Sequence, residues 1–195
     1  MNCNFLDNYW KQKTIRADKH FDALDVELIS KINCPGIPRD KIKTFYKGTK
    51  AWDIHFPSKK VAIEYKTIAT EQKGKTVQNQ LHINLKKHMG SRVEEAIGCA
   101  IDLKHFDEEY KLGYILVFTL PRDKNLIMPK TLIDKTILKF EKMVSKNLYN
   151  FFCPLITFGI GDHMELSEKY SFERFINDIN SVPPINKNTL DGFFI

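Results

Sequence analysis

No stretch of this sequence is apolar for long enough to cross a membrane. The longest apolar runs, such as YILVF at residues 114–118, fall far short of the roughly 20 residues that a membrane-spanning helix needs. The N-terminal segment 1–20 is too polar to contain the apolar core of a signal peptide. These two absences predict a soluble protein of the cytoplasm.

Cysteine is also scarce. The sequence has four cysteines, and they are scattered along the chain: Cys3, Cys34, Cys99 and Cys153. None of them has the C-x-x-C or His-rich spacing of a structural zinc site, and their placement does not suggest a disulfide framework. This pattern favours a reducing cytosol. Internal repeats and low-complexity segments are lacking as well, which argues against a repeat architecture.

What the sequence does have is enough apolar material for one core. Its 195 residues are 43% hydrophobic and 12% aromatic. We therefore expect a single domain over residues 1–195, with a core at about residues 17–160. The formal net charge is +6, which is compatible with a nucleic-acid partner and equally with a basic protein that binds no polyanion.

The spacing of the apolar residues predicts a mixture of helices and strands. The expected order is a helix at 17–32, strands at 51–56 and 61–68, a helix at 92–106, a buried strand at 112–120, a helix around 133–148, a strand at 151–160 and a short helix around 172–179. The simplest architecture for this order is an α/β fold, a mixed central sheet flanked by helices on both sides.

Two details of this scheme concern the middle of the chain. The segment 69–91 is polar and basic without a clear period, so we predict a long connection, which is more often functional than decorative. Gly98 lies inside the helix predicted at 92–106, where glycine costs about 1 kcal/mol relative to alanine. We therefore expect the helix to pack closely against a neighbour at Gly98.

Asp53, Glu64 and Lys66 are charged residues within the two predicted strands of a hairpin. Successive side chains of a strand point to opposite faces, so Glu64 and Lys66 are expected on one face of the second strand. Asp53 is expected on one face of the first strand. The opposite faces are expected to carry two apolar sets: Trp52, Ile54 and Phe56, and Val61, Ile63 and Tyr65.

The turn between the strands determines which residues lie opposite each other. A turn centred between Ser58 and Lys59 pairs Asp53 with Glu64, with their β-carbons about 4.5–5.5 Å apart. Two directly opposed carboxylates repel each other, so a purely structural hairpin should avoid this pair. A surface hairpin whose polar face happens to be charged is the simpler alternative.

A divalent cation between the two carboxylates would replace this repulsion with attraction. Mg²⁺ takes oxygen ligands at about 2.0–2.1 Å and is usually held by one or two carboxylates together with several waters. Lys66, further along the same face, would position or deprotonate a water, or offset charge on a phosphate. The pattern predicts a phosphodiesterase centre in which Asp53, Glu64 and Lys66 are catalytic and Asp53 and Glu64 bind the metal.

The same residues resemble the PD-(D/E)xK nuclease motif: Asp53, then Glu64 and Lys66 two positions apart, after hydrophobic residues at 61–63. The surrounding sequence is similar to the XhoI-like branch of type II restriction endonucleases. Four blocks carry this similarity in the same order: KAWD at 50–53, AIEYK at 62–66, RVEEAIG at 92–98 with DL at 102–103, and LGY at 112–114. Trp52 stands where the motif name has proline.

This resemblance implies a restriction-endonuclease-like fold and a reaction. The reaction is Mg²⁺-dependent, sequence-specific hydrolysis of double-stranded DNA that leaves 5′-phosphates. A homodimer is implied, because one chain carries one site and cutting both strands needs two. A companion methyltransferase would protect the host DNA, with no contact to this chain implied. Glu27, on the first predicted helix, is the candidate for an additional active-site carboxylate, with a solvated helix charge as the alternative.

The basic segment after the second strand is the expected DNA-reading region. Asn and Gln side chains pair with adenine and Arg or Lys with guanine, while lysines also contact phosphates. The candidate DNA-binding residues are Gln78, Asn79, Asn84, Lys86, Lys87 and Arg92. A solvated basic loop is the alternative, and Arg92, Glu94 and Glu95 would alternatively hold the start of the following helix together.

Two other functions are compatible with the sequence. One is a repair or nicking nuclease of the same superfamily, which would act as a monomer. The other is a non-catalytic DNA-binding protein with a decayed nuclease fold, although the intact Asp53, Glu64 and Lys66 weigh against it.

Overall fold

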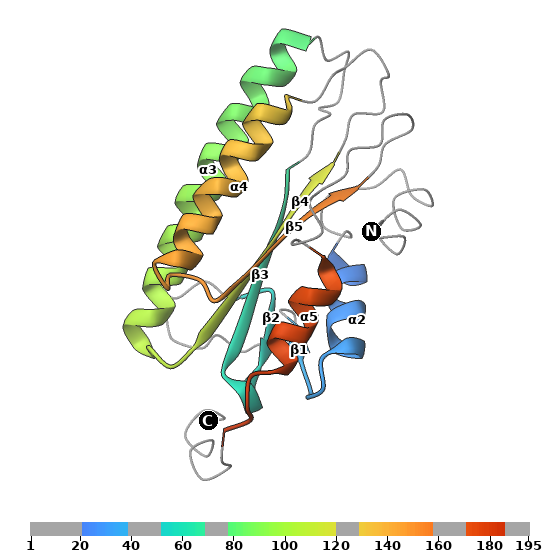
Figure 1. The fold of residues 1–195 in the computed structure, drawn as a ribbon, viewed down its shortest axis with the longest axis vertical. Helices are drawn as coiled ribbons and strands as arrows, with labels where there is room; N and C mark the ends of the chain where they lie inside the picture. The colour runs from blue at the N-terminus through green and yellow to red at the C-terminus, as the bar shows by residue number, and fades with distance from the viewer. Residues whose placement is uncertain (1–20, 39–51, 69–77, 120–128, 158–170, 186–195) are drawn as a thin grey trace.

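The computed structural model describes residues 21–38, 52–68, 78–119, 129–157 and 171–185. Five strands in this part of the chain form one mixed sheet in the order β1-β2-β3-β4-β5, and helices cover both of its faces (Figure 1). The elements in chain order are α2 (Phe21–Lys31), β1 (Ile37–Pro38), β2 (Ile54–Phe56), η3 (Pro57–Lys59, a 3₁₀ turn), β3 (Val61–Ile68), α3 (Gln78–Phe106), β4 (Lys111–Thr119), α4 (Lys130–Ser145), β5 (Phe151–Thr157) and α5 (Phe172–Asn180). The predicted α/β class with helices on both sides is confirmed.

The hairpin of β2 and β3 has the predicted register. The two strands run antiparallel, and Ile54 pairs with Ile63, which is the alignment expected from a turn between Ser58 and Lys59. The turn closes through Lys60, whose backbone is left-handed with φ of 47°. From β3 onwards the strands are parallel, with α3 and then α4 as the crossover helices.

The sheet separates two hydrophobic cores. Val61, Ile63 and Tyr65 of β3 pack towards α2 and α5, whereas Ala62 packs towards α3 and α4. The predicted division of β3 into two faces is therefore confirmed. Both cores also take residues from β4, which explains why the sequence of that strand is apolar without alternation.

Trp52 does not lie where the alternation predicted. It belongs to the core on the α3 and α4 side, while Ile54 and Phe56 belong to the other core. The reason is that β2 begins at Ile54, so Trp52 precedes the strand and the two-residue period does not apply to it. Its ring lies 6.3 Å from that of Tyr149, measured between centroids.

Helix α3 is much longer than predicted, and the expected connection at 69–91 is wrong from Gln78 onwards. The helix has 29 residues and begins at Gln78. Leu81, Leu85, Met89 and Val93 are buried at intervals of four residues, so one narrow apolar stripe anchors the more polar first half of the helix. No helix in the described part of the chain is long and apolar enough to cross a membrane.

The expectation of close packing at Gly98 is also wrong. A β-carbon added at Gly98 would meet no described atom within 4 Å. Closely packed glycines lie elsewhere: an added β-carbon at Gly36 would lie 2.6 Å from the Phe56 ring, and one at Gly113 of β4 would lie 3.2 Å from side-chain atoms of both Ile63 and Phe175. Gly113 thus allows β3 and α5 to approach β4.

The turn of the β2–β3 hairpin is fastened to the end of α5. Lys59 is almost completely buried, and its ammonium donates hydrogen bonds to the backbone oxygens of Asn180, at 3.0 Å, and Val182. A cation at the C-terminus of a helix also interacts favourably with the helix dipole. In addition, the amide of Ile185 donates to the carbonyl of Ser58 at 2.7 Å. The hairpin is therefore held at its turn as well as along β3.

Candidate active site

Asp53, Glu64 and Lys66 lie together on the side of the sheet covered by α3. The two carboxylates are buried, with 2% of Asp53 and 5% of Glu64 exposed. The Lys66 ammonium forms a close ion pair with Glu64 and lies 3.7 Å from a carboxylate oxygen of Asp53. The predicted group is therefore brought together, and burial makes a charged surface hairpin an inadequate description of it.

Asp53 is positioned by the backbone of the opposite strand. It sits just before β2, and its Oδ2 accepts a hydrogen bond from the backbone N–H of Tyr65 at 2.9 Å. This bond spans the hairpin and fixes the direction of the carboxylate. As a result, Asp53 faces Glu64 without being a paired strand residue.

Burial and charge oppose the ionised form of Glu64. Burial first, and then the nearby carboxylate of Asp53, raises the pKa of Glu64 to about 7, although Lys66 partly offsets this shift. For Lys66 itself, burial would lower the pKa, but the carboxylates of Glu64 and Asp53 outweigh it and raise the pKa above its ordinary value. The site thus carries excess negative charge that one ammonium does not fully neutralise.

Glu95 of α3 is a neighbour of this site that the sequence did not assign to it. Its Oε1 lies 4.0 Å from the Lys66 ammonium, and its Oε2 pairs with Arg92 at 2.6 Å. The alternative in which Arg92, Glu94 and Glu95 hold the start of a helix is wrong as to place: Arg92 does pair with Glu95, but both lie in the middle of α3. In the sequence, Glu95 belongs to the RVEEAIG block, which supports the family resemblance but assigns Glu95 no role at the site.

Glu27 is not placed at the site by any described contact. Its carboxylate lies 3.6 Å from the ammonium of Lys31 on its own helix. Helix α2 packs on the opposite face of the sheet from Glu64 and Lys66. The alternative of a helix-surface charge therefore describes Glu27 better, and the additional carboxylate near Lys66 is Glu95.

The donor set fits a small, hard cation. Among the described residues, no group of three or more His, Cys, Asp or Glu side chains is placed to hold a metal ion. Mg²⁺ needs only one or two carboxylates, because it keeps several waters. The Lys66 ammonium already lies within ion-pair distance of both Asp53 and Glu64, so the space between these carboxylates is suited to positive charge.

The candidate DNA-binding residues all fall on α3. Lys86 and Lys87 are exposed, and Asn84 and Arg92 are half-buried; the side chains of Gln78 and Asn79 lie outside the described part of the structure. Asn84 and Glu95 are separated by about three helical turns, so both lie on the same flank of α3, roughly 16 Å apart along its axis. Arg92 belongs with Glu95 at the site.

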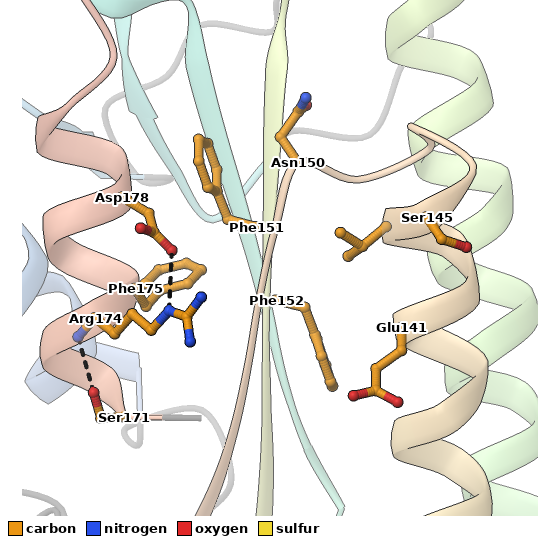
Figure 2. Close-up of a pocket in the computed structure, with 10 residues that line it drawn as sticks. Glu141, Ser145, Asn150, Phe151, Phe152, Ser171, Arg174, Phe175 and Asp178 are labelled. Carbon is orange, nitrogen blue, oxygen red and sulfur yellow. Dashed lines mark hydrogen bonds and ion pairs between the residues drawn. The ribbon is translucent and has the colours of Figure 1, made fainter. Parts of the chain in front are cut away.

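A hollow lies at the β5 edge of the sheet, two strands across from Glu64, because Phe152 pairs with Tyr114 and Tyr114 pairs with Glu64. It has a volume of about 400 Å³ and lies beside β5, between α4 and α5. Figure 2 shows Phe151 and Phe175 on one side of β5 and Phe152 on the other, with Arg174 directed towards Asp178. None of Asp53, Glu64 and Lys66 lines this hollow, so its size does not make it the candidate active site.

Comparison of the chain with protein-family models, with curated proteins and with solved structures finds no match. The functional argument therefore rests on the residues and their geometry.

The raised pKa of Glu64 predicts how stability depends on pH without metal. Between the ordinary value of 4.5 and about 7, the folded protein keeps a proton on Glu64 that the unfolded chain releases. The contribution of Glu64 to the stability of the folded protein is therefore fully present below pH 4.5 and is lost as the pH rises through 7. Glu64→Gln should remove this loss and stabilise the protein at pH 8 by up to about 3 kcal/mol.

The measurement is urea unfolding in EDTA at several pH values, with wild type and variant compared at each. The comparison cancels the opposite contribution of His55, whose pKa burial lowers to about 3. Asp107→Asn, at a carboxylate paired with Lys60 away from the site, is the matched control. Equal stability of Glu64→Gln and wild type at pH 8 would contradict the prediction.

Proposed function

We propose that this protein is a Mg²⁺-dependent endonuclease that cleaves double-stranded DNA at specific sequences, with the restriction-endonuclease-like fold that the sequence resemblance implies. The observation that carries this proposal is the buried meeting of Asp53, Glu64 and Lys66 on one face of the β2–β3 hairpin. Two buried carboxylates with surplus negative charge suit a divalent cation, and a lysine beside them suits phosphodiester chemistry. The cytoplasm is the proposed compartment.

In this proposal each residue has a separate role. Asp53 and Glu64 would hold Mg²⁺, which would supply Lewis-acid activation of the phosphate and of the attacking water. Lys66 contributes positive charge at the scissile phosphate and a donor that orients the water. Neutralisation of the two carboxylates would lower the pKa of Lys66 from its raised value, which brings the amine closer to accepting a proton.

Two copies of the chain are proposed to act together, because one copy carries one such site. The test is incubation of plasmid DNA with the protein in Mg²⁺ and in EDTA, followed by gel electrophoresis. Discrete linear fragments that require Mg²⁺ support the proposal. Nicked circles alone favour the nicking or repair alternative, and unchanged plasmid in Mg²⁺ favours a non-catalytic protein.

Exposed lysines of α3 are proposed to contact DNA phosphates. Replacing Lys86 and Lys87 together with glutamine should weaken binding to all DNA sequences. It should also reduce the slope of log K against log salt by about 2, since each phosphate contact contributes about 0.9. The measurement is fluorescence anisotropy with labelled duplex at several salt concentrations.

The matched control replaces two exposed lysines at the end of α4, the other crossover helix: Lys142 in its last turn and Lys146 directly after it. These two lysines are close in sequence to Asn147, whose backbone oxygen accepts a hydrogen bond from Lys104. Lys104 is about three turns of α3 beyond Arg92, so this end of α3 is remote from Lys86 and Lys87. Their replacement should leave the salt slope nearly unchanged. An equal loss of slope in both double variants would contradict DNA contact centred on Lys86 and Lys87.

A different effect is expected at a base-reading position. Replacing Asn84, which lies on the same flank of α3 as Glu95, should cost about 1–3 kcal/mol of discrimination at one base pair. Binding to unrelated sequences should change little. Unaltered site preference in Asn84→Ala would move base reading to another part of the chain.

A further inference from the structure

Tyr114 of β4 has a fully buried side chain, and its hydroxyl has no hydrogen-bond partner in the part of the chain that the structure describes. Taking a hydroxyl out of water without giving it a partner costs free energy. Buried polar groups in native proteins are nearly always paired, so an unpaired one requires a physical reason.

The position of Tyr114 suggests that reason. Tyr114 and Glu64 pair in the parallel register of β3 and β4, so both side chains leave the sheet on the face covered by α3 and α4. The ring is held by Phe140, with centroids 4.6 Å apart, and by Tyr149, which meets it edge-on at 5.4 Å. Burial first, and then the carboxylates of Glu64 and Glu95, raises the pKa of Tyr114 well above its ordinary value. The result is a firmly held O–H donor on the same face of the sheet as Glu64 and within the influence of the Glu64 and Glu95 charges.

Tyr149 provides an internal comparison. It is equally buried and contacts Tyr114, and burial followed by the influence of Tyr114 and Glu64 also raises its pKa well above the ordinary value. Its hydroxyl, however, donates to the backbone oxygen of Ala96 at 2.9 Å. The two tyrosines thus share their surroundings and differ in whether the hydroxyl has a partner among the residues that the structure describes.

We propose that Tyr114 is a positioning residue of the Asp53–Glu64 site, whose hydroxyl donates a hydrogen bond to an oxygen atom that arrives with the divalent cation. This inference rests on the proposed function, because it requires a cation between Asp53 and Glu64. The acceptor oxygen has two possible sources, a water or a DNA phosphate. Metal binding without DNA tests the first source, and cleavage tests the second.

The experiment compares Tyr114→Phe with Tyr149→Phe. Thermal unfolding in EDTA measures the fold, the Mg²⁺ concentration that gives half of the metal-induced rise in Tm measures cation binding without DNA, and plasmid cleavage at saturating Mg²⁺ measures the reaction. Tyr114→Phe should be at least as stable as wild type in EDTA, with a Tm up to about 2–4 °C higher. Tyr149→Phe should have a lower Tm, because the Ala96 oxygen loses its donor.

In the presence of Mg²⁺, Tyr114→Phe should be the impaired variant and Tyr149→Phe should not. Tyr114→Phe should need about 10–100-fold more Mg²⁺ if the acceptor is a water, or cleave about 10–100-fold more slowly with an unchanged Mg²⁺ midpoint if the acceptor is a phosphate oxygen. Tyr149→Phe should keep the wild-type midpoint and rate.

Three results would overturn the proposal. A Tyr114→Phe chain that does not fold, or that loses as much stability as Tyr149→Phe, makes the hydroxyl a structural group. Wild-type metal binding and cleavage by Tyr114→Phe remove its role at the site while leaving the nuclease proposal intact. A wild-type protein that is neither stabilised by Mg²⁺ nor able to cleave DNA overturns the proposed function together with this inference.

Discussion

Asp53→Asn should abolish Mg²⁺-dependent cleavage of plasmid DNA while the protein stays folded. Asparagine keeps an oxygen that can accept the N–H of Tyr65, the bond that spans the hairpin at 2.9 Å. It removes the charge that would hold the cation, so the loss of rate should exceed the roughly 10²-fold upper end for groups that only support a metal ligand. Gel electrophoresis measures the rate, and urea unfolding measures the fold.

The metal-free Asp53→Asn protein should be at least as stable as wild type, because the repulsion between two opposed carboxylates is relieved. DNA binding in EDTA should survive the change. Asp107→Asn is the matched control, since Asp107 also pairs with a lysine, Lys60 at 3.0 Å, away from the site. It should cleave at the wild-type rate. Near wild-type cleavage by Asp53→Asn would remove the basis for a nuclease of this type.

Lys66→Ala should slow the reaction without weakening metal binding. The Lys66 ammonium forms a close ion pair with Glu64, so it competes with any cation at that carboxylate. Without it, the Mg²⁺ concentration for half-maximal stabilisation should stay the same or fall. Cleavage at saturating Mg²⁺ should nevertheless slow by about 10²- to 10⁴-fold, as expected for the loss of a positioned proton-transfer group.

The control for Lys66 is Lys104→Ala. Lys104 is half-buried on α3, and its ammonium donates to the backbone oxygen of Asn147 and not to a site carboxylate. Its removal should change stability modestly and leave the rate at saturating Mg²⁺ unchanged. Wild-type cleavage by Lys66→Ala would show that the lysine serves only to neutralise Glu64 in the absence of metal.

Much of the hairpin could be predicted because its determinants are local. The two strands alternate apolar and polar residues and are joined by a short turn, so few strand registers are possible. The pairing of Ile54 with Ile63 then follows from the position of the turn. The two-residue period also assigned Glu64 and Lys66 to one face of β3. Asp53 lies near Glu64 although it precedes β2, because its carboxylate accepts a hydrogen bond from the Tyr65 N–H of the opposite strand.

The misjudged features depend on contacts with distant parts of the chain. The first half of α3 is stabilised by a single stripe at Leu81, Leu85 and Met89, whose partners lie on the sheet and α4, so the segment alone looks polar. The side chain of Trp52 packs in the core beneath α3 and α4, and its direction is determined by that packing and not by strand alternation. Glu95 reaches Lys66 only because α3 crosses β3, and no spacing in the sequence expresses that contact.

The fastening of Lys59 to the backbone of Asn180 has a consequence for the order of synthesis. These two residues are 121 positions apart, so at about 5–20 residues per second a ribosome needs about 6–24 seconds to make the chain between them. During that time the nascent hairpin already carries Asp53, Glu64 and Lys66 but lacks the partner that holds its turn. A chain with the proposed chemistry would therefore complete this site only after residue 185 has been made and has paired with Ser58.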